Sequence, residues 1–204
     1  MIVGITPDIK KYFTTYIDIL DHNWINYFES KKINYFQFPN SVKLTNNILR
    51  RKNLKIDLII FPGGCDINNN KPNIFRINTE KNILKFAIKK KIPLIGICHG
   101  MQLINVFFKG KLSKVKNHMK KNKQIYLKNK NIFNKNQLTV KCYHNYGIKE
   151  KFLGINLKSL GNDSLGDVEI FKHKNYKIYG FMFHPEREKN YNNLDKIIKF
   201  NSKK

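Results

Sequence analysis

The segment from Lys91 to Asn105 constrains the fold of this chain more than any other stretch, and it reads KIPLIGICHGMQLIN. Its first part, Ile92–Ile97, is a short apolar run of the length expected for a buried strand in a parallel sheet. From Met101 onward the apolar residues recur at helical spacing. A strand, a tight turn and a helix therefore follow one another here, with Cys98 at the turn.

The glycines on either side of this cysteine predict a catalytic turn. In a Gly-x-nucleophile-x-Gly turn the central residue has a strained backbone, and Gly96 and Gly100 let neighbouring elements approach it closely. Cys98 would lie at a helix N-terminus, which stabilises a thiolate. The backbone N–H of His99 would point to the place where an oxyanion forms. The alternative is a structural cysteine buried between a core strand and a core helix.

The length of the chain fits one domain, and we expect a single domain over residues 1–204. The sequence has no apolar run long enough to cross a membrane, and its start, MIVGITPDIKK, lacks the pattern of a signal peptide. The three cysteines, Cys65, Cys98 and Cys142, have no metal-ligand spacing. We therefore expect a soluble cytoplasmic protein with reduced thiols.

The formal net charge of +25 would ordinarily indicate a polyanion partner. The lysines are spread along the whole chain, however, and abundant Asn and Ile accompany them, which is the pattern of codon bias in an AT-rich genome. No motif of a nucleic-acid-binding fold accompanies the charge. We expect neither a nucleic-acid nor a membrane partner, but the charge favours anionic small molecules by long-range attraction.

Apolar periodicity and turn residues predict the order of the elements. A βαβ unit begins the chain, and a polar segment at Lys111–Lys123 reads as a loop. The predicted helices are Ile17–Phe28, Val42–Leu49, Thr79–Lys90 with Thr79 as its cap, and Leu194–Phe200. The predicted strands are Ile2–Thr6, Ile33–Phe38, Asp57–Phe61, Ile92–Ile97, Gln124–Leu127, Gln137–Cys142, Asp167–Phe171 and Lys177–Phe183.

Two strand ends besides the cysteine turn carry residues suited to chemistry. After the strand Asp57–Phe61 comes Pro-Gly-Gly, in which Gly63 and Gly64 allow a backbone N–H to turn inward over the sheet edge. After the last strand come His184 and Glu186, which would share one face of an extended segment, so that the carboxylate orients the imidazole. A plain turn is the alternative for the glycine pair.

A cluster of polar side chains, Tyr143, His144 and Asn145, ends the strand Gln137–Cys142. By itself this cluster is an ordinary polar turn before a glycine. Three motifs nevertheless stand in order along the chain: FPGGCDI, GICHGMQ and FHPERE. Together they resemble the class I, or triad, glutamine amidotransferase-like superfamily, and each falls at the predicted strand end that the family requires.

Finer details are similar to the γ-glutamyl hydrolase branch, of the peptidase C26 type, over most of the chain. This branch includes hydrolases of γ-glutamyl-γ-aminobutyrate, and of γ-glutamyl-CDP-amidate in capsule phosphoramidate synthesis. The segments that carry the likeness are ILDHNWINYF, the GGCDI loop, YHNYGI and FHPERE. The resemblance implies an α/β fold with an open, mostly parallel, flavodoxin-like sheet flanked by helices and extended by extra antiparallel strands.

The resemblance also implies roles for individual residues. Cys98 would be the nucleophile, His184 the general base and then acid, and Glu186 the residue that orients it. Gly64 and His99 would supply the oxyanion hole. The elements that hold the glutamyl group would be Gly63, Gln102, Tyr143, His144 and Asn145. Residue 99 is often Arg or Leu in the family, so the role of its side chain stays open, and Cys65 and Cys142 are expected to be bystanders.

The implied reaction is hydrolysis of a γ-glutamyl amide through a thioester, with no metal or organic cofactor. The substrate would be a small, anionic γ-glutamyl compound. An alternative within the family is a glutaminase subunit that supplies ammonia to a separate synthase, which uses the same catalytic residues. An alternative of another class is a basic protein that binds polyanions without catalysis, and it would be indifferent to the loss of Cys98.

Overall fold

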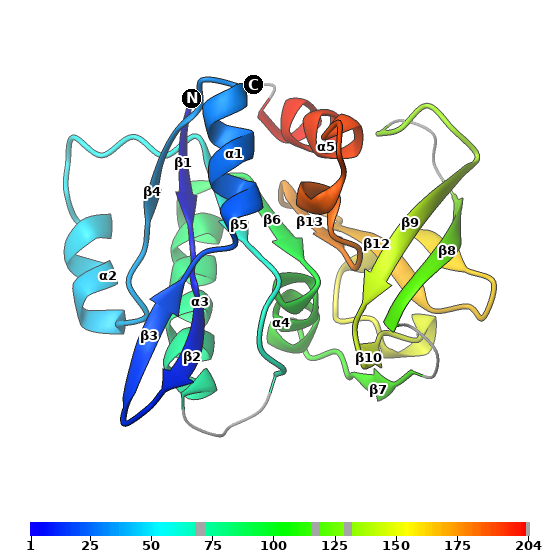
Figure 1. Ribbon diagram of the computed structural model, residues 1–204, viewed down its shortest axis with the longest axis horizontal. Coiled ribbons are helices and arrows are strands. Elements are labelled where there is room, and N and C mark those ends of the chain that lie inside the picture. Colours follow the sequence, from blue (N-terminus) through cyan, green and yellow to red (C-terminus); the bar gives the residue numbers. More distant parts are fainter. Residues whose placement is uncertain (68–71, 116–118, 129–131, 203–204) are drawn as a thin grey trace.

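One sheet organises the computed structural model, which describes residues 1–67, 72–115, 119–128 and 132–202. Within these residues the sheet has nine strands in the order β4-β1-β5-β6-β13-β12-β11-β8-β9 (Figure 1). Their bounds are β1 Ile2–Ile5, β4 Asn34–Gln37, β5 Leu58–Phe61, β6 Leu94–Ile97, β8 Met119–Leu127, β9 Gln137–Tyr143, β11 Leu157–Asp163, β12 Val168–His173 and β13 Ile178–Phe181.

The sheet has a parallel half and an antiparallel half. Strands β4, β1, β5, β6 and β13 pair in parallel, and β12, β11, β8 and β9 extend the sheet with antiparallel pairs. The predicted α/β fold, with an open sheet and added antiparallel strands, is confirmed. Because the carboxyl ends of neighbouring parallel strands meet at one edge, the segments that follow β5, β6 and β13 lie together.

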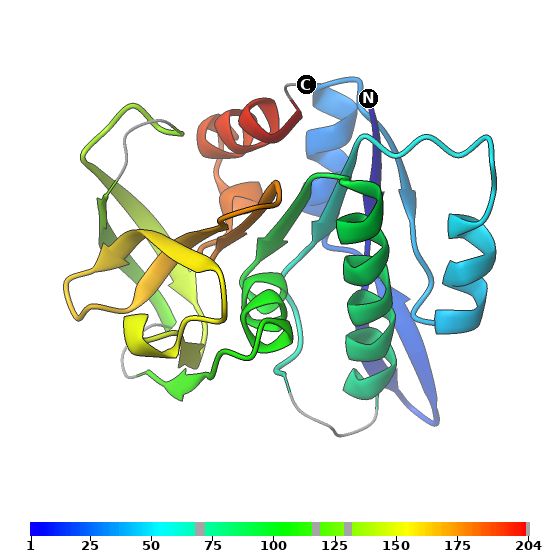
Figure 2. The same cartoon turned by 180° about the vertical axis from the view of Figure 1, so that it is seen from behind.

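Helices cover both faces of the parallel half (Figures 1 and 2). On one face α1 (His22–Ser30) and α5 (Asn192–Ser202) bury Trp24, Phe28 and Ile197 against β1, β5 and β6. On the other face lie α2 (Val42–Leu49), α3 (Asn73–Lys90) and α4 (His99–Phe107). The four-residue strands β5 and β6 are buried along their whole length, as a parallel sheet covered on both faces requires.

The N-terminal helix predicted at Ile17–Phe28 is wrong in its first turn. The residues before Leu20 form a hairpin of β2 (Asp8–Tyr12) and β3 (Thr15–Ile19), and α1 begins only at His22. Asp21 caps this helix, because its carboxylate accepts a hydrogen bond from the backbone N–H of Asn23 at 3.0 Å. The apolar residues of β3 also fit a period of two, so periodicity alone did not separate strand from helix.

Helix α3 begins at Asn73, six residues before the predicted start, and Thr79 is a buried residue within it rather than its cap. The first two turns escaped prediction because they bury two charged residues on the core side. Arg76 and Glu80 are both 0% exposed and pair through Nε and Oε1 at 2.9 Å. A buried ion pair one helical turn apart disrupts the apolar pattern by which a helix is recognised.

The predicted polar loop at Lys111–Lys123 is also partly wrong. It contains β7 (Ser113–Lys114), which pairs with β10 (Tyr146–Gly147), and the start of β8, which pairs with β9; residues 116–118 lie outside the described residues. Strand β11 was not predicted. These strands carry many lysines or alternate poorly, so their sequences lack the apolar signal of the parallel half. The other predicted elements are confirmed with small shifts at their ends.

Candidate active site

The turn between β6 and α4 holds Cys98 in a conformation that L residues rarely adopt, with φ 47° and ψ −99°. Space explains the two flanking glycines: a Cβ atom at Gly96 would collide with the backbone of Gly100, and one at Gly100 with the backbone of Phe61. The backbone N–H of Cys98 donates to the Phe181 carbonyl of β13 at 2.8 Å. The strained turn is thus held by packing and by the sheet itself.

The segment after β13 brings a histidine and a glutamate together. His184 Nδ1 lies 2.6 Å from Glu186 Oε1, and the two residues are 7% and 1% exposed. The predicted shared face of an extended segment is wrong, because Pro185–Arg187 forms a short 3-10 helix that contains Glu186. The tight turn nevertheless carries the carboxylate back to the imidazole that precedes it.

The surroundings of His184 favour its charged form. Burial lowers the pKa of His184, but the Glu186 carboxylate and a hydrogen bond with the Cys98 sulfur outweigh it and raise that pKa to about 10. A protonated imidazole between a carboxylate and a sulfur is the arrangement of a thiolate–imidazolium pair. Because β6 and β13 are hydrogen-bonded neighbours, the cysteine and the histidine come from adjacent strand ends.

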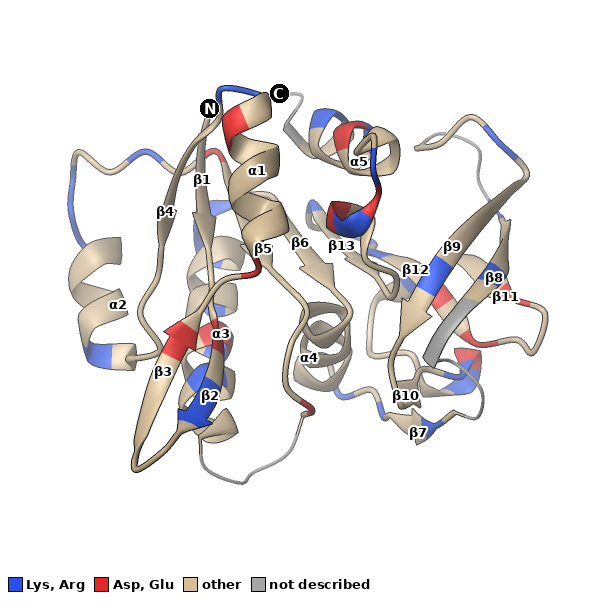
Figure 3. Ribbon diagram, in the orientation of Figure 1, with Lys and Arg blue, Asp and Glu red and all other residues tan. Residues whose placement is uncertain are grey.

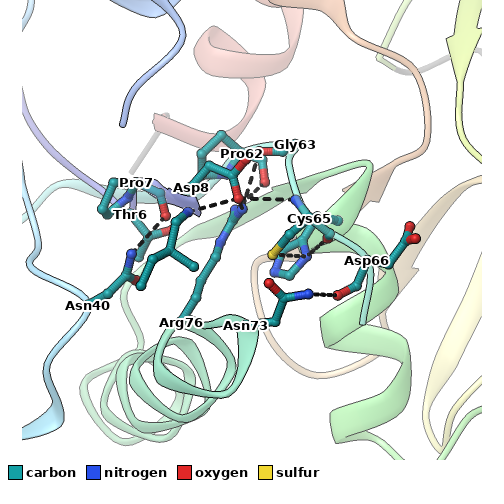
Figure 4. A network of polar contacts seen from close by, with 12 residues as sticks. Thr6, Pro7, Asp8, Asn40, Pro62, Gly63, Cys65, Asp66, Asn73 and Arg76 are labelled. Atoms are coloured by element: carbon teal, nitrogen blue, oxygen red, sulfur yellow. Dashed lines mark hydrogen bonds and ion pairs between the residues drawn. The ribbon is translucent and has the colours of Figure 1, made fainter. Parts of the chain in front are cut away.

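The glycine pair after β5 faces this pair of side chains. A Cβ atom at Gly63 would overlap the ring of His184, so this glycine lies directly against the imidazole. Gly64 has φ 152°, and a Cβ atom there would overlap Arg76 and Asp8 on the opposite side of the loop. The loop is therefore held between the histidine in front and an ion pair behind, as Figure 4 shows for Asp8, Arg76 and Gly63.

The side chain of His99, whose role the sequence left open, connects the cysteine turn to this loop. Its Nδ1 lies 2.6 Å from the Cys65 carbonyl oxygen, and its Nε2 lies 2.8 Å from Glu80 Oε2. Arg76 and Glu80 complete the group, and neither was singled out from the sequence. The signal that was available is their spacing of four residues on one helix, which allows an ion pair.

The residues predicted to hold substrate lie in different surroundings. Tyr143 lies beside His184, with its ring 5.6 Å from the imidazole and nearly perpendicular to it. Gln102 instead donates its amide to the Tyr146 carbonyl at 2.9 Å, and Asn145 is exposed. The buried His144 turns toward the interior, where its Nδ1 lies 2.9 Å from the Tyr146 carbonyl oxygen.

A group of side chains that could ligate a metal comes from the end of β9 and from β12. Its members, Cys142, His144 and Glu169, have ligand atoms within 4.8 Å of one another. Burial raises the pKa of Glu169 to about 8, with Lys123 opposing and nearby carboxylates adding to the effect. The Lys123 ammonium lies 3.9 Å from Glu169 Oε1, so a cationic group already faces this carboxylate. A divalent ion would have to displace it, and the group supplies no argument for a metal centre.

A cleft of about 430 Å³ opens beside the glycine loop. Its walls come from the β2–β3 hairpin, the start of α1 and the 3-10 turn, and they include Lys10, Trp24, Gly64 and Arg187.

Figure 3 shows that Lys and Arg occur on helices, strands and loops across the molecule instead of on one element. Among the described residues, no helix combines the length and apolar character needed to cross a membrane.

Comparisons with known proteins identify the family of this chain. The chain matches the family Glutamine amidotransferase class-I over residues 15–201. A γ-glutamyl-CDP-amidate hydrolase from Campylobacter jejuni subsp. jejuni is 35% identical over 142 residues, which cover 68% of this chain and 66%, just under two thirds, of that protein. A glutamine-hydrolyzing GMP synthase subunit of Methanococcus vannielii is 31% identical over 166 residues, covering 76% of this chain and 79% of that protein.

Among solved structures, a protein described as a GMP synthase subunit from Thermoplasma acidophilum superimposes with a TM-score of 0.72 at 21% sequence identity. The superposition covers 98% of this chain and 93% of that one, and at this identity it shows a shared fold. The family match spans most of the sequence, including all three strand ends that form the site. The chain therefore belongs to the class-I glutamine amidotransferase family.

Proposed function

We propose that this protein is a cysteine-dependent hydrolase of γ-glutamyl amides. Cys98 is the nucleophile, His184 the general base and acid, and Glu186 the residue that holds the imidazole in place. The backbone N–H groups of Gly64 and His99 stabilise the oxyanion. The observation that carries the proposal is the 2.6 Å contact between His184 Nδ1 and Glu186 Oε1 beside the strained turn at Cys98.

The reaction begins when the Cys98 thiolate attacks the γ-carbonyl carbon and the carbonyl electrons move onto its oxygen. As the oxyanion collapses, the C–N bond breaks and His184 gives its proton to the departing nitrogen, leaving a γ-glutamyl thioester. Water then loses a proton to His184 and attacks the thioester carbon. Collapse of the second oxyanion breaks the C–S bond, which releases glutamate and restores the thiolate.

The leaving group is the finer part of the proposal. The relative from Campylobacter jejuni is a γ-glutamyl-CDP-amidate hydrolase, and a similar substrate would suit the cleft of about 430 Å³ beside Gly64. This volume is in the range of pockets that hold whole organic ligands and far exceeds the needs of ammonia. Hydrolysis of such an amidate in the reducing cytoplasm, in capsule phosphoramidate synthesis, is the form of the function that we favour.

A second candidate is a glutaminase subunit that passes ammonia to a separate synthase. The GMP synthase proteins of Methanococcus vannielii and Thermoplasma acidophilum support it by their similarity to this chain. The catalytic residues would be unchanged, so the two functions differ in substrate and in dependence on a partner. An isolated glutaminase subunit of this kind would release little glutamate from glutamine until its synthase is added.

The test is glutamate release by the isolated protein from glutamine, γ-glutamyl-γ-aminobutyrate and a γ-glutamyl phosphoramidate of a nucleotide. Cys98→Ala is the catalytic control, and Cys142→Ala is a matched control at a buried cysteine outside the proposed mechanism. We expect fastest release from the phosphoramidate, with a loss of at least about 10⁴-fold in Cys98→Ala and normal activity in Cys142→Ala.

The outcomes separate the candidates. A preference for γ-glutamyl-γ-aminobutyrate would keep the hydrolase and replace its leaving group. Activity restricted to glutamine, and raised by a synthase, would establish the glutaminase subunit. Turnover that survives in Cys98→Ala would exclude both mechanisms.

A further inference from the structure

The glycine loop after β5, which carries the proposed oxyanion donor Gly64 and is also called the oxyanion loop here, packs on a buried ionic network. The proposed chemistry does not itself use this network. Arg76 and Glu80 are 0% exposed and His99 is 1% exposed. From α3 the Arg76 guanidinium reaches Asp8 Oδ1 at 2.8 Å and the Pro62 carbonyl oxygen at 2.7 Å (Figure 4). Glu80 lies between Arg76 and His99. The network thus joins the first strands of the chain, the glycine loop and the cysteine turn.

The ring of His99 lies between two acceptor groups. Nδ1 faces the Cys65 carbonyl oxygen, which can only accept a hydrogen bond, so Nδ1 must carry a proton. Nε2 faces Glu80 Oε2. Burial would raise the pKa of Glu80, but the charge of Arg76 and the hydrogen bonds to the carboxylate outweigh it and lower that pKa to about 2, so this carboxylate also accepts hydrogen bonds. Both ring nitrogens of His99 therefore face hydrogen-bond acceptors.

Arg76 controls the direction of one peptide group in the loop. Its Nη1 lies 3.4 Å from the Gly63 carbonyl oxygen. In a trans peptide the carbonyl and the following N–H point in opposite directions. A Gly63 carbonyl that turns toward Arg76 therefore turns the Gly64 N–H away from the network, to the side on which Gly63 meets the His184 ring. The same guanidinium would block any side chain at residue 64.

The residue after Gly64, Cys65, is anchored through both its backbone N–H and its backbone carbonyl. The Cys65 backbone N–H donates to Asp8 Oδ1 at 3.0 Å, which leaves it unable to serve the oxyanion. The Cys65 carbonyl is bound by the His99 ring. His99 is also the residue whose own N–H is the second proposed oxyanion donor, so one residue links both donors. A shift of the loop relative to α4 would have to break this contact.

From these contacts we infer that His99 is a positioning residue: its ring, held at both nitrogens, acts with Arg76 and Glu80 to keep the Gly64 amide aligned with the His99 amide for oxyanion binding. The inference rests on the proposed function in taking Cys98 as the nucleophile and the Gly64 and His99 amides as the oxyanion donors. It assigns His99 an effect on steps that create an oxyanion and none on the reactivity of the thiolate itself. An arginine at this position would serve equally, because it presents permanent donors to both acceptors.

The experiment compares two reagents that attack the same sulfur. Acylation by p-nitrophenyl acetate joins Cys98 to the acetyl carbon, creates an oxyanion and expels p-nitrophenolate. Alkylation by iodoacetamide joins Cys98 to a methylene carbon and expels iodide, without an oxyanion. Neither reagent needs γ-glutamyl recognition, so the result stands apart from the choice of substrate. The variants are His99→Phe, His99→Gln and His99→Arg, with His173→Phe as a control at a buried histidine elsewhere.

We expect acylation by His99→Phe to fall about 10²-fold, the size of the loss when an oxyanion donor is removed, while alkylation stays within about twofold. His99→Gln, whose donors share one nitrogen and cannot reach both acceptors, should fall in the same direction and covers the case in which His99→Phe does not fold. His99→Arg and His173→Phe should acylate nearly as fast as the wild type. Equal losses in both reactions, or no loss in either, would overturn the inference.

Discussion

The Nδ1 atom of His184 lies 2.6 Å from Oε1 of Glu186, and nearly all of both side chains is withdrawn from solvent. A contact this short between an imidazole and a carboxylate is a charge-assisted hydrogen bond. It fixes the ring so that its other nitrogen serves the cysteine sulfur. If His184 and Glu186 act as proposed, the charge of Glu186 is expected to affect both the rate of the reaction and the stability of the fold.

Glu186→Gln is expected to lower kcat by about 10² to 10⁴-fold with little change in KM. The amide keeps the shape of the carboxylate but neither stabilises the imidazolium nor fixes the productive tautomer. Steady-state glutamate release measures the effect. Glu188→Gln is the matched control, because Glu188 lies two residues away and bonds Asn193 outside the site. Equal losses in the two variants would show that the effect is not specific to the imidazole contact.

The stability of the protein should depend on the ionisation of His184. Its pKa is raised from 6.5 to about 10 in the folded state, so the stabilisation from its protonated form is complete below pH 6.5. It is lost as the pH rises from 6.5 through 10. Urea unfolding at pH 6, 8 and 10 should show a steeper decline for the wild type than for Glu186→Gln. Parallel declines in the two proteins would contradict the assignment.

Gly63→Ala should damage catalysis more than it damages folding. The added methyl group would overlap the His184 ring, so the ring or the oxyanion loop must move, and kcat is expected to fall at least about 10²-fold. Gly166→Ala is a useful comparison, because its φ of 76° disfavours alanine while no atom lies within 4 Å of the new Cβ. That variant should lose about 1 to 2 kcal/mol of stability and keep its kcat.

The three thiols should differ in reactivity at neutral pH. Burial raises the pKa of Cys65 to about 12, with Arg76 opposing the effect, and burial also raises the pKa of Cys142. Cys98 instead shares a hydrogen bond with the charged His184 ring. Substoichiometric iodoacetamide at pH 7, followed by peptide mapping, should therefore modify Cys98 first. Initial modification of Cys65 would show that the oxyanion loop opens more readily than these contacts imply.

The three strand-end motifs were predictable because the residues within each motif are neighbours in the sequence. Gly63, Cys98 and His184 each follow a short apolar strand directly, and a parallel sheet gathers such ends at one edge. The side-chain role of His99 was not predictable, since its partners Glu80 and Cys65 are brought to it by α3 and the glycine loop. In a sequence, a buried charged residue is visible only as an interruption of the apolar pattern of a helix or strand.

The antiparallel half of the sheet was the hardest part to predict. Its outer strands β8 and β9 contain several lysines, of which Lys141 is exposed, and β11 is interrupted by irregular pairing with β12. In such strands the signal comes from cross-strand partners far away in sequence and not from local preference. The end of the β2–β3 hairpin was misassigned for a related reason, because Ile17 of β3 also falls at helical spacing with Leu20 and Trp24.

The backbone hydrogen bond from Cys98 to Phe181 ties the spacing of the proposed nucleophile and the proposed base to the sheet. The two residues come from neighbouring strands, and neighbouring strands lie about 4.8 Å apart whatever side chains they carry. Mutations that remodel the hairpin, the cleft or the outer strands can therefore change which molecule is cleaved without altering the distance that the proton travels. Evolution within this fold is free to exchange substrates while it inherits the reaction.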